Sequence, residues 1–155
     1  MTRTPKVFLI ALPVGAFACA ALSLFLYYQW WVPNQRLKDP QWWNTASNGE
    51  LKEVAQRVLT CPVGGHHDAF LVLSEFGDAA SIPYLLAGLR WQPHTAPGEP
   101  MKCTKLHCLK ALRAITGHDA GRNYSDWAEW WASTGSKLPR TAFPLNDQPV
   151  GHSDR

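Results

Sequence analysis

The chain begins with a long apolar segment that contains no charged residue. Val7 to Tyr28 covers 22 residues, and only Pro13, Gly15 and Ser23 interrupt large apolar or small side chains. At about 1.5 Å of rise per residue, a helix of this length reaches about 33 Å, enough to cross a hydrocarbon core of about 30 Å. Aromatic residues suited to the depth of the lipid headgroups follow at once: Tyr27, Tyr28, Trp30 and Trp31. The pattern predicts a transmembrane anchor over residues 1–31.

A cleavable secretory signal is the alternative for this segment. Ala18-Cys19-Ala20 has the small-x-small pattern of a cleavage site. Cleavage there would leave the apolar residues 21–28 at the new N-terminus, and the apolar region of a signal usually has about 7 to 15 residues. The sequence therefore favours an uncleaved anchor.

The charges on either side of the span indicate its orientation. Arg3 and Lys6 precede it, whereas Arg36 and Lys38 beyond it are partly offset by Asp39. Because Lys and Arg are enriched on the cytoplasmic side of membrane proteins, we expect a single-pass protein with a cytoplasmic N-terminus. The rest of the chain is then expected outside the cytoplasm, in a periplasmic or extracellular space.

The remainder of the chain has apolar residues at helical rather than alternating spacing. They fall in four groups: Leu51, Val54, Ala55, Val58 and Leu59; Ile82, Leu85, Leu86 and Leu89; Cys108, Ala111, Leu112 and Ile115; and Trp127, Trp130 and Trp131. The expected fold class is all-α, with an N-terminal transmembrane helix and a small bundle of about five helices over residues 48–135. Residues 32–47 are expected to form a juxtamembrane linker, and the proline-containing residues 136–155 an extended or disordered tail.

Local signals place the helix ends. Ser47 or Asn48 can cap the first helix, and the second, residues 67–76, is apolar nearly all round and should lie in the centre of the bundle. Gly77 is expected to end it as a left-handed cap, and Asp78 to cap the third helix, so that these two helices pack antiparallel as a hairpin.

The second half of the domain also contains signals that end and begin helices. Prolines and a glycine make residues 91–101 an irregular loop, and a fourth helix is expected over residues 102–115, ending at Thr116-Gly117. Ser125 is expected to cap a short final helix that ends at Gly135.

The second and fourth predicted helices match each other at an offset of 39 residues. Ala69, Leu73 and Phe76 align with Cys108, Leu112 and Ile115. A period of about 40 is that of two-helix solenoid repeats. On this basis the segment 76–86 resembles HEAT-like repeat proteins of bacteria, and residues 111–119 with the three tryptophans are similar to a closing repeat of the same proteins. The resemblance implies stacked α-hairpins that bind other proteins, with no catalytic residues to transfer. Because two repeats are visible and solenoids usually need about three, we expect a compact bundle.

Cysteines and histidines are the candidate chemical groups. In an oxidising compartment, a disulfide between Cys61 and Cys103 would close a loop of about 42 residues and stabilise the domain by about 4 kcal/mol, leaving Cys108 as a buried thiol. Two alternatives stay open: ordinary free cysteines, and a tetrahedral zinc site of Cys61, His66, Cys103 and His107. The zinc site is conceivable because Cys103 and His107, at i and i+4, share one face of a helix.

Other polar and aromatic clusters have simpler interpretations. His66-His67-Asp68 lies at a helix start, where capping and the helix dipole favour polar and acidic residues, and His118-Asp119 is expected in the turn after a helix. The three tryptophans, at relative positions 0, 3 and 4, are expected to pack in the core rather than to form a binding platform.

Charge and motifs limit the function. From Val32 onward the chain has 13 Lys or Arg against 12 Asp or Glu, so it lacks the basic surface that nucleic acid requires. The sequence contains no phosphate-binding loop, haem-attachment motif or nucleophile elbow. We therefore expect a membrane-tethered protein-interaction module, a scaffold or adaptor, without catalysis or cofactor; the alternative is a zinc-binding protein.

Overall fold

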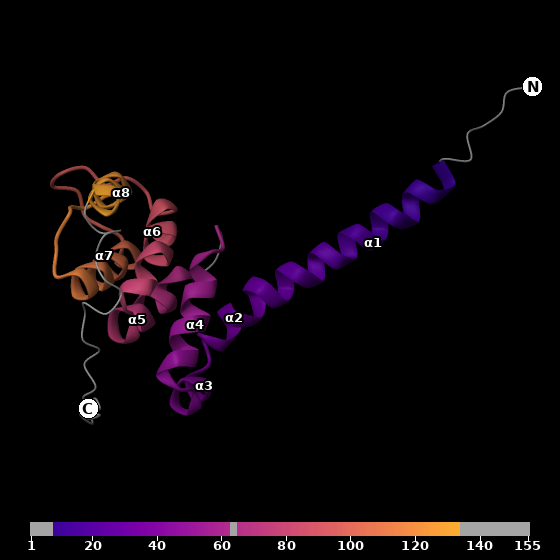
Figure 1. Cartoon of the computed structure of the whole chain (residues 1–155), viewed down its shortest axis with the longest axis horizontal. Helices are drawn as coiled ribbons and strands as arrows, with labels where there is room; N and C mark the ends of the chain where they lie inside the picture. Colours follow the sequence, from indigo (N-terminus) through magenta and orange to yellow (C-terminus); the bar gives the residue numbers. More distant parts are fainter. Residues whose placement is uncertain (1–7, 63–64, 134–155) are drawn as a thin grey trace, which may run out of the picture.

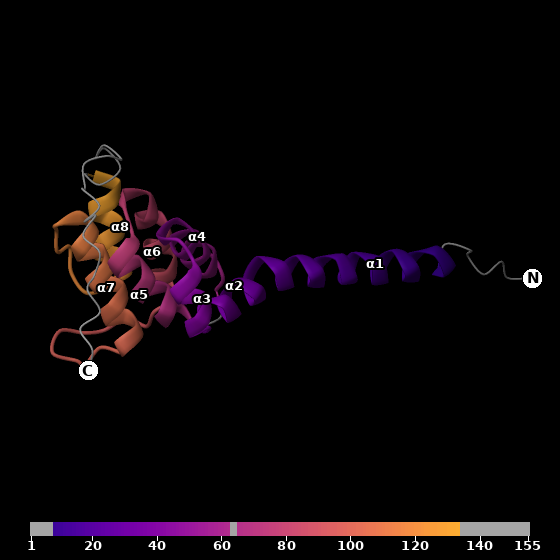
Figure 2. The ribbon, with the colours of Figure 1, turned by 90° about the horizontal axis from the view of Figure 1, so that it is seen from below.

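The computed structural model describes residues 8–62 and 65–133, with side chains from residue 15 onward. In these ranges the regular structure is helical. One long N-terminal helix extends from a group of shorter helices that pack around one core (Figures 1 and 2). The predicted all-α fold class is confirmed for this part of the chain.

The N-terminal helix runs without a break through three labelled elements. These are α1 (Phe8–Leu26), the π-helical turn η1 (Tyr27–Trp31) and α2 (Val32–Arg36). Its stretch Gly15–Arg36 is long and apolar enough to cross a membrane, and the most apolar part of that stretch has no buried residue.

The π-helical turn changes which residues face the domain. Val32 donates its backbone N–H to Tyr27 O, five residues back, and Pro33 has no N–H with which to continue the α-helical pattern. Trp30 lies on the domain side, where its Nε1 donates to Thr60 Oγ1 at 3.1 Å. Tyr27 and Trp31 remain exposed and stack at 4.8 Å between ring centroids. The turn therefore attaches the helix to the domain through Trp30 and leaves Tyr27 and Trp31 exposed.

Residues 32–47 are more ordered than the predicted linker. They form α2 and α3 (Pro40–Thr45), with the Asp39 carboxylate accepting from Gln41 N at the start of α3. Leu37 lies between the two helices and is 2% exposed, and Trp43 Nε1 donates to its carbonyl at 2.7 Å. This segment is therefore part of the folded domain.

The core is built on a central helix. The helices α4 (Asn48–Leu59), α5 (His66–Phe76), α6 (Ile82–Arg90), α7 (Cys103–Thr116) and α8 (Tyr124–Ser133) form the domain, with the short 3-10 turn η2 (Ala79–Ser81) before α6. α5 packs against α4 on one side and α7 on the other. Ala69, Phe70, Val72 and Leu73 of α5 are fully buried, which confirms the predicted central position of this helix.

Two of the predicted helix ends are confirmed. Ser47 caps α4 in a capping box: its hydroxyl accepts from Glu50 N, and the Glu50 carboxylate accepts from Ser47 N at 2.9 Å. At the end of α7, Gly117 has a left-handed backbone with φ of 64°. Residues 91–101 form the expected loop without regular structure.

Gly77, by contrast, is not a left-handed cap. Its backbone is extended, with φ of −73° and ψ of 152°. A glycine is needed there because a Cβ would run into Leu73 O and would lie 2.8 Å from Ile115 Cδ1. The extended backbone leads into η2, and α6 packs mainly against α4, α7 and α8. The prediction that the second and third helices pack antiparallel as a hairpin is therefore not confirmed.

The final helix begins earlier than predicted. α8 starts at Tyr124, and Asp126 rather than Ser125 satisfies the free N–H groups there: its Oδ2 accepts from Arg122 N at 3.1 Å and from Asn123 N at 3.0 Å. The predicted end at Gly135 and the tail 136–155 lie outside the described residues.

A buried lysine fastens the loop 91–101 to the domain. Lys105 of α7 is 1% exposed. Its ammonium donates to Pro93 O at 2.9 Å, Thr95 Oγ1 at 2.9 Å and Asn123 Oδ1 at 2.7 Å, so all three of its N–H donors are used. One side chain thus joins α7, the loop and the start of α8.

We predict that Lys105→Met destabilises the domain by about 2 to 4 kcal/mol, because the substitution removes three hydrogen bonds of a buried ammonium and leaves Asn123 Oδ1 only its bond from Thr95 N. Lys110→Met, at an exposed position of the same helix, should change stability by less than about 0.5 kcal/mol. Denaturant unfolding of the full chain in detergent, followed by circular dichroism, measures both. Equal effects of the two variants would contradict the role assigned to Lys105.

Candidate functional site

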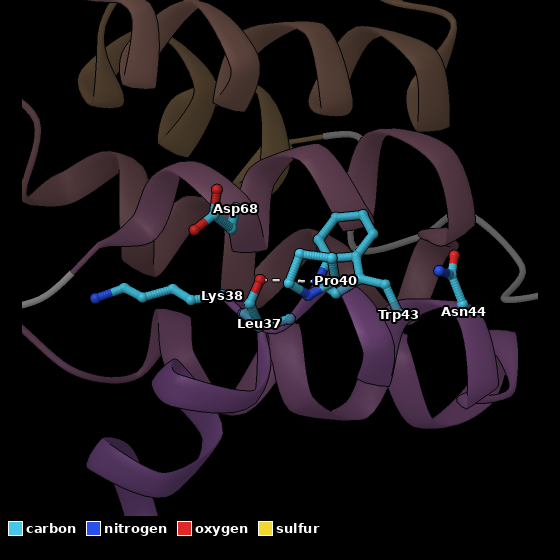
Figure 3. Close-up of a pocket in the computed structure, with 6 residues that line it drawn as sticks. All are labelled: Leu37, Lys38, Pro40, Trp43, Asn44 and Asp68. Atoms are coloured by element: carbon cyan, nitrogen blue, oxygen red, sulfur yellow. Dashed lines mark hydrogen bonds between the residues drawn. The ribbon is translucent and has the colours of Figure 1, made fainter. Parts of the chain in front are cut away.

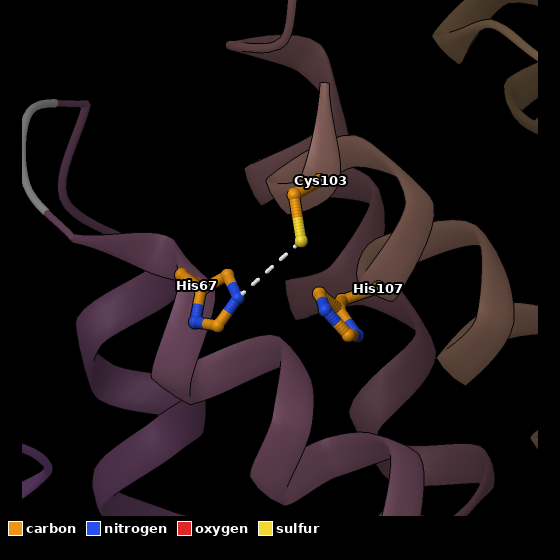
Figure 4. Close-up of side chains that lie close together, drawn as sticks. All are labelled: His67, Cys103 and His107. Carbon is orange, nitrogen blue, oxygen red and sulfur yellow. Dashed lines mark hydrogen bonds between the residues drawn. The ribbon is translucent and has the colours of Figure 1, made fainter. Parts of the chain in front are cut away.

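Two histidines and a cysteine converge between α5 and α7. The ligand atoms of His67, Cys103 and His107 all lie within 4.8 Å of one another. Cys103 Sγ is 3.7 Å from His67 Nε2, and the two imidazole rings meet edge to face at 4.8 Å between centroids (Figure 4). The cluster is therefore a set of nitrogen and sulfur donors of the kind that binds transition metals.

The packing of α5 against α7 brings these residues together. His67 is the second residue of α5, and Cys103 is the first residue of α7. His107 follows Cys103 by four residues, one helical turn, so the two side chains share the face of α7 that lies toward α5. The predicted sharing of a face by Cys103 and His107 is confirmed.

Asp68 determines which nitrogen of His67 faces the cysteine. Its Oδ1 lies 3.2 Å from His67 Nδ1. A carboxylate accepts hydrogen bonds and does not donate them, so Nδ1 carries the proton and donates to Asp68. Nε2 is then the ring nitrogen that faces Cys103, on the side where a metal ion would bind.

The cluster lies at the surface. Cys103 is exposed, and His67 and His107 are half-buried. Burial lowers the pKa of His107, and the neighbouring His67 and Lys110 lower it further. Each of these effects disfavours the imidazolium and so favours the neutral ring, which is the form that binds metals.

Two of the four residues of the alternative zinc set, Cys61 and His66, are not part of this cluster. His66 is only 4% exposed and its Nε2 lies 2.7 Å from Cys61 O, so its ring is directed into the domain. Burial lowers the pKa of His66, although the contact with Cys61 O opposes this effect. In the structure His67, rather than Cys61 or His66, lies beside Cys103 and His107.

The predicted disulfide between Cys61 and Cys103 is not present in the structure. Cys61 is buried beyond the end of α4, 6% exposed, whereas Cys103 lies at the surface with its sulfur toward His67. Cys108 is fully buried, as predicted, and its thiol donates to Leu85 O at 3.5 Å. Burial raises the pKa of Cys108 well above that of an ordinary thiol.

The remaining candidates take part in packing and turns. Trp127 is fully buried and its Nε1 donates to Gly121 O at 3.1 Å, which confirms that this tryptophan belongs to the core. Trp130 is partly buried and stacks on His118 at 5.0 Å between ring centroids. Asp119 pairs with Arg113 at 3.0 Å in the turn after α7, as expected for His118-Asp119.

An open pocket of about 450 Å³ lies between α3 and the start of α5 (Figure 3). Its lining combines an apolar wall with two opposite charges: Leu37, Lys38, Pro40, Trp43, Asn44 and Asp68. Asp68 is shared between this pocket and the hydrogen bond to His67. The sequence does not predict this pocket, because the packing of residues 37–44 against the start of α5 depends on tertiary contacts.

Comparison with known proteins assigns neither a family nor a function to the chain. No protein-family model, curated protein or solved structure matches the chain.

We predict that the exposed Cys103 thiol reacts with iodoacetamide at least about 100-fold faster than Cys108 in the folded, reduced chain, because Cys108 is buried and its pKa is raised. Peptide mass spectrometry at increasing reaction times measures both rates, and unfolded protein serves as the control in which they converge. Similar rates in the folded chain would contradict the burial of Cys108. A Cys61–Cys103 peptide found without reductant would restore the predicted disulfide.

Proposed function

We propose that this protein is a membrane-anchored helical binding module. In this proposal α1 crosses the bilayer, and the domain from α2 to α8 holds a protein partner close to the membrane surface. The observation that carries the proposal is the position of α1, which extends away from the domain (Figures 1 and 2). From residue 15 onward its large apolar side chains are not covered by the part of the chain that the structure describes: Phe17 is 78% exposed and Phe25 is 60% exposed. A bilayer supplies the apolar environment that such a helix requires.

The aromatic residues at the end of α1 support a membrane surface at this point. Tyr27, Tyr28 and Trp31 are exposed on η1, directly between the apolar helix and the domain. Tyrosine and tryptophan favour the interface between hydrocarbon and water, where an apolar ring and a polar edge are both satisfied. The domain would then begin within one or two helical turns of the headgroups.

The attachment of the helix to the domain supports a domain held close to the membrane rather than one on a flexible linker. The helix continues through η1 into α2, Trp30 donates to Thr60, and Pro33 and Leu37 are buried in the domain. These contacts limit the distance that the domain can move from the bilayer. A module held in this way would present its partner at a fixed height above the membrane.

A protein is the proposed partner because of the resemblance to HEAT-like repeat proteins, whose helical hairpins most often bind other proteins. The positive charges of Arg3 and Lys6 before the span favour a cytoplasmic N-terminus, which would place the domain on the extracytoplasmic side. In this proposal the module acts by binding and not by catalysis.

We expect the full chain to remain in the membrane pellet after a carbonate wash at high pH, because an integral helix is not released when surface charges are disrupted. The double variant Phe17→Arg/Leu22→Arg should move to the supernatant, since each arginine costs about 2.5 to 3.5 kcal/mol in the centre of a span. Immunoblotting of both fractions measures the distribution.

The matched control is Leu106→Arg, which places the same charge at an exposed leucine of the domain and should leave the protein in the pellet. Release of the unsubstituted chain by carbonate would contradict the anchor. Equal retention of the double variant would show that α1 does not carry the membrane attachment.

A further inference from the structure

We propose that His67, Cys103 and His107 bind one zinc ion, with a fourth coordination position open to solvent. This site goes beyond the proposed binding function, and it stands on its own residues and distances. Its three side chains come from two helices and point toward one another (Figure 4).

The distances suit zinc with little rearrangement. Zinc binds Cys sulfur at about 2.3 Å and His nitrogen at about 2.0 to 2.1 Å. In a tetrahedral site these lengths place a sulfur and a nitrogen ligand about 3.6 Å apart. Cys103 Sγ and His67 Nε2 are already 3.7 Å apart. The remaining separations, all within 4.8 Å, close by small rotations of half-buried and exposed side chains.

The contact between His67 and Asp68 is a second observation that points to a metal. Metal-binding histidines commonly donate their other ring N–H to a carboxylate, which fixes the ring and makes the free nitrogen a better ligand. Asp68 Oδ1 lies 3.2 Å from Nδ1 of His67, on the opposite side of the ring from the nitrogen that faces Cys103. A histidine held in this way is oriented for coordination before the ion arrives.

The donor set selects the class of ion. Two imidazoles and one thiolate favour zinc and similar transition metals, whereas magnesium and calcium require oxygen ligands. Three protein ligands leave the fourth tetrahedral position for water or for a group from another molecule. The exposure of Cys103 leaves that position accessible.

Bound zinc would also join α5 to α7. His67 lies on α5, and Cys103 and His107 lie on the first turns of α7, so the ion would bridge two helices of the core. A ligand that binds only the folded state raises its stability. Zinc is therefore expected to raise the melting temperature of the domain.

The test is a titration of the full chain in detergent, stripped of metal and kept reduced, with Zn²⁺ against a chromogenic chelator. We expect one Zn²⁺ per chain. Co²⁺ in place of Zn²⁺ should give an absorption band of sulfur-to-metal charge transfer, which reports a single thiolate ligand. Circular dichroism of each variant checks that it is folded.

The variants separate this site from the other arrangements of cysteine and histidine. Cys103→Ser should remove the charge-transfer band, and His107→Gln should weaken Zn²⁺ binding at least about 10-fold. His94→Gln, at an exposed histidine outside the cluster, and Cys61→Ala should leave binding unchanged. Asp68→Asn should weaken binding about 10- to 100-fold, because the neutral amide supports His67 less well, while the metal-free chain stays folded and loses only the small helix-dipole stabilisation that the Asp68 charge gives to the start of α5.

Two results would overturn the proposal. One is the absence of stoichiometric Zn²⁺ in the folded, reduced chain. Another is a charge-transfer band that survives Cys103→Ser but is lost in Cys61→Ala. Neither result depends on membrane attachment, so failure of the zinc site and failure of the anchor are distinguishable.

Discussion

The burial of α5 is the constraint on which the rest of the structure depends. Its apolar residues point to several sides, so the helix is stable only with neighbours on more than one face, and α4 and α7 supply them. Each neighbour has a second role. α4 leads to Thr60, which accepts the hydrogen bond from Trp30 of the N-terminal helix, and α7 brings Cys103 and His107 opposite His67. One packing arrangement therefore sets both the attachment of the N-terminal helix to the domain and the geometry of the site.

Features of the fold that depend on residues close together in the sequence were predictable. The apolar N-terminal helix, the Ser47 cap of α4 and the end of α7 at Thr116-Gly117 each follow from local chemistry. Gly77 was misjudged because its requirement is tertiary: the approach of Leu73 and Ile115 leaves no room for a Cβ. The segment 32–47 was misjudged for a similar reason, since burial of Leu37 depends on helices that are distant in sequence.

In the site too, some features follow from local sequence and others depend on tertiary packing. The i, i+4 spacing correctly placed Cys103 and His107 on one face of a helix. The choice between His66 and His67 depends on where α5 begins and how it is rotated, and successive residues of a helix point about 100° apart. In the structure His66 turns inward to Cys61 O and His67 turns toward α7. No local signal distinguishes two adjacent histidines, so this choice required the packed helices.

The central claim is that α1 crosses the bilayer and continues as one rigid helix into the domain. Amide hydrogen exchange of the full chain in lipid nanodiscs tests it most directly, because exchange is slow where a hydrogen-bonded backbone is shielded from water and does not open. We expect slow exchange, comparable with that of α5, at every backbone amide from Gly15 through Arg36 except at Pro33, which has no N–H. Rapid exchange over residues 15–26 would contradict the span, and rapid exchange confined to residues 27–36 would contradict the rigid attachment.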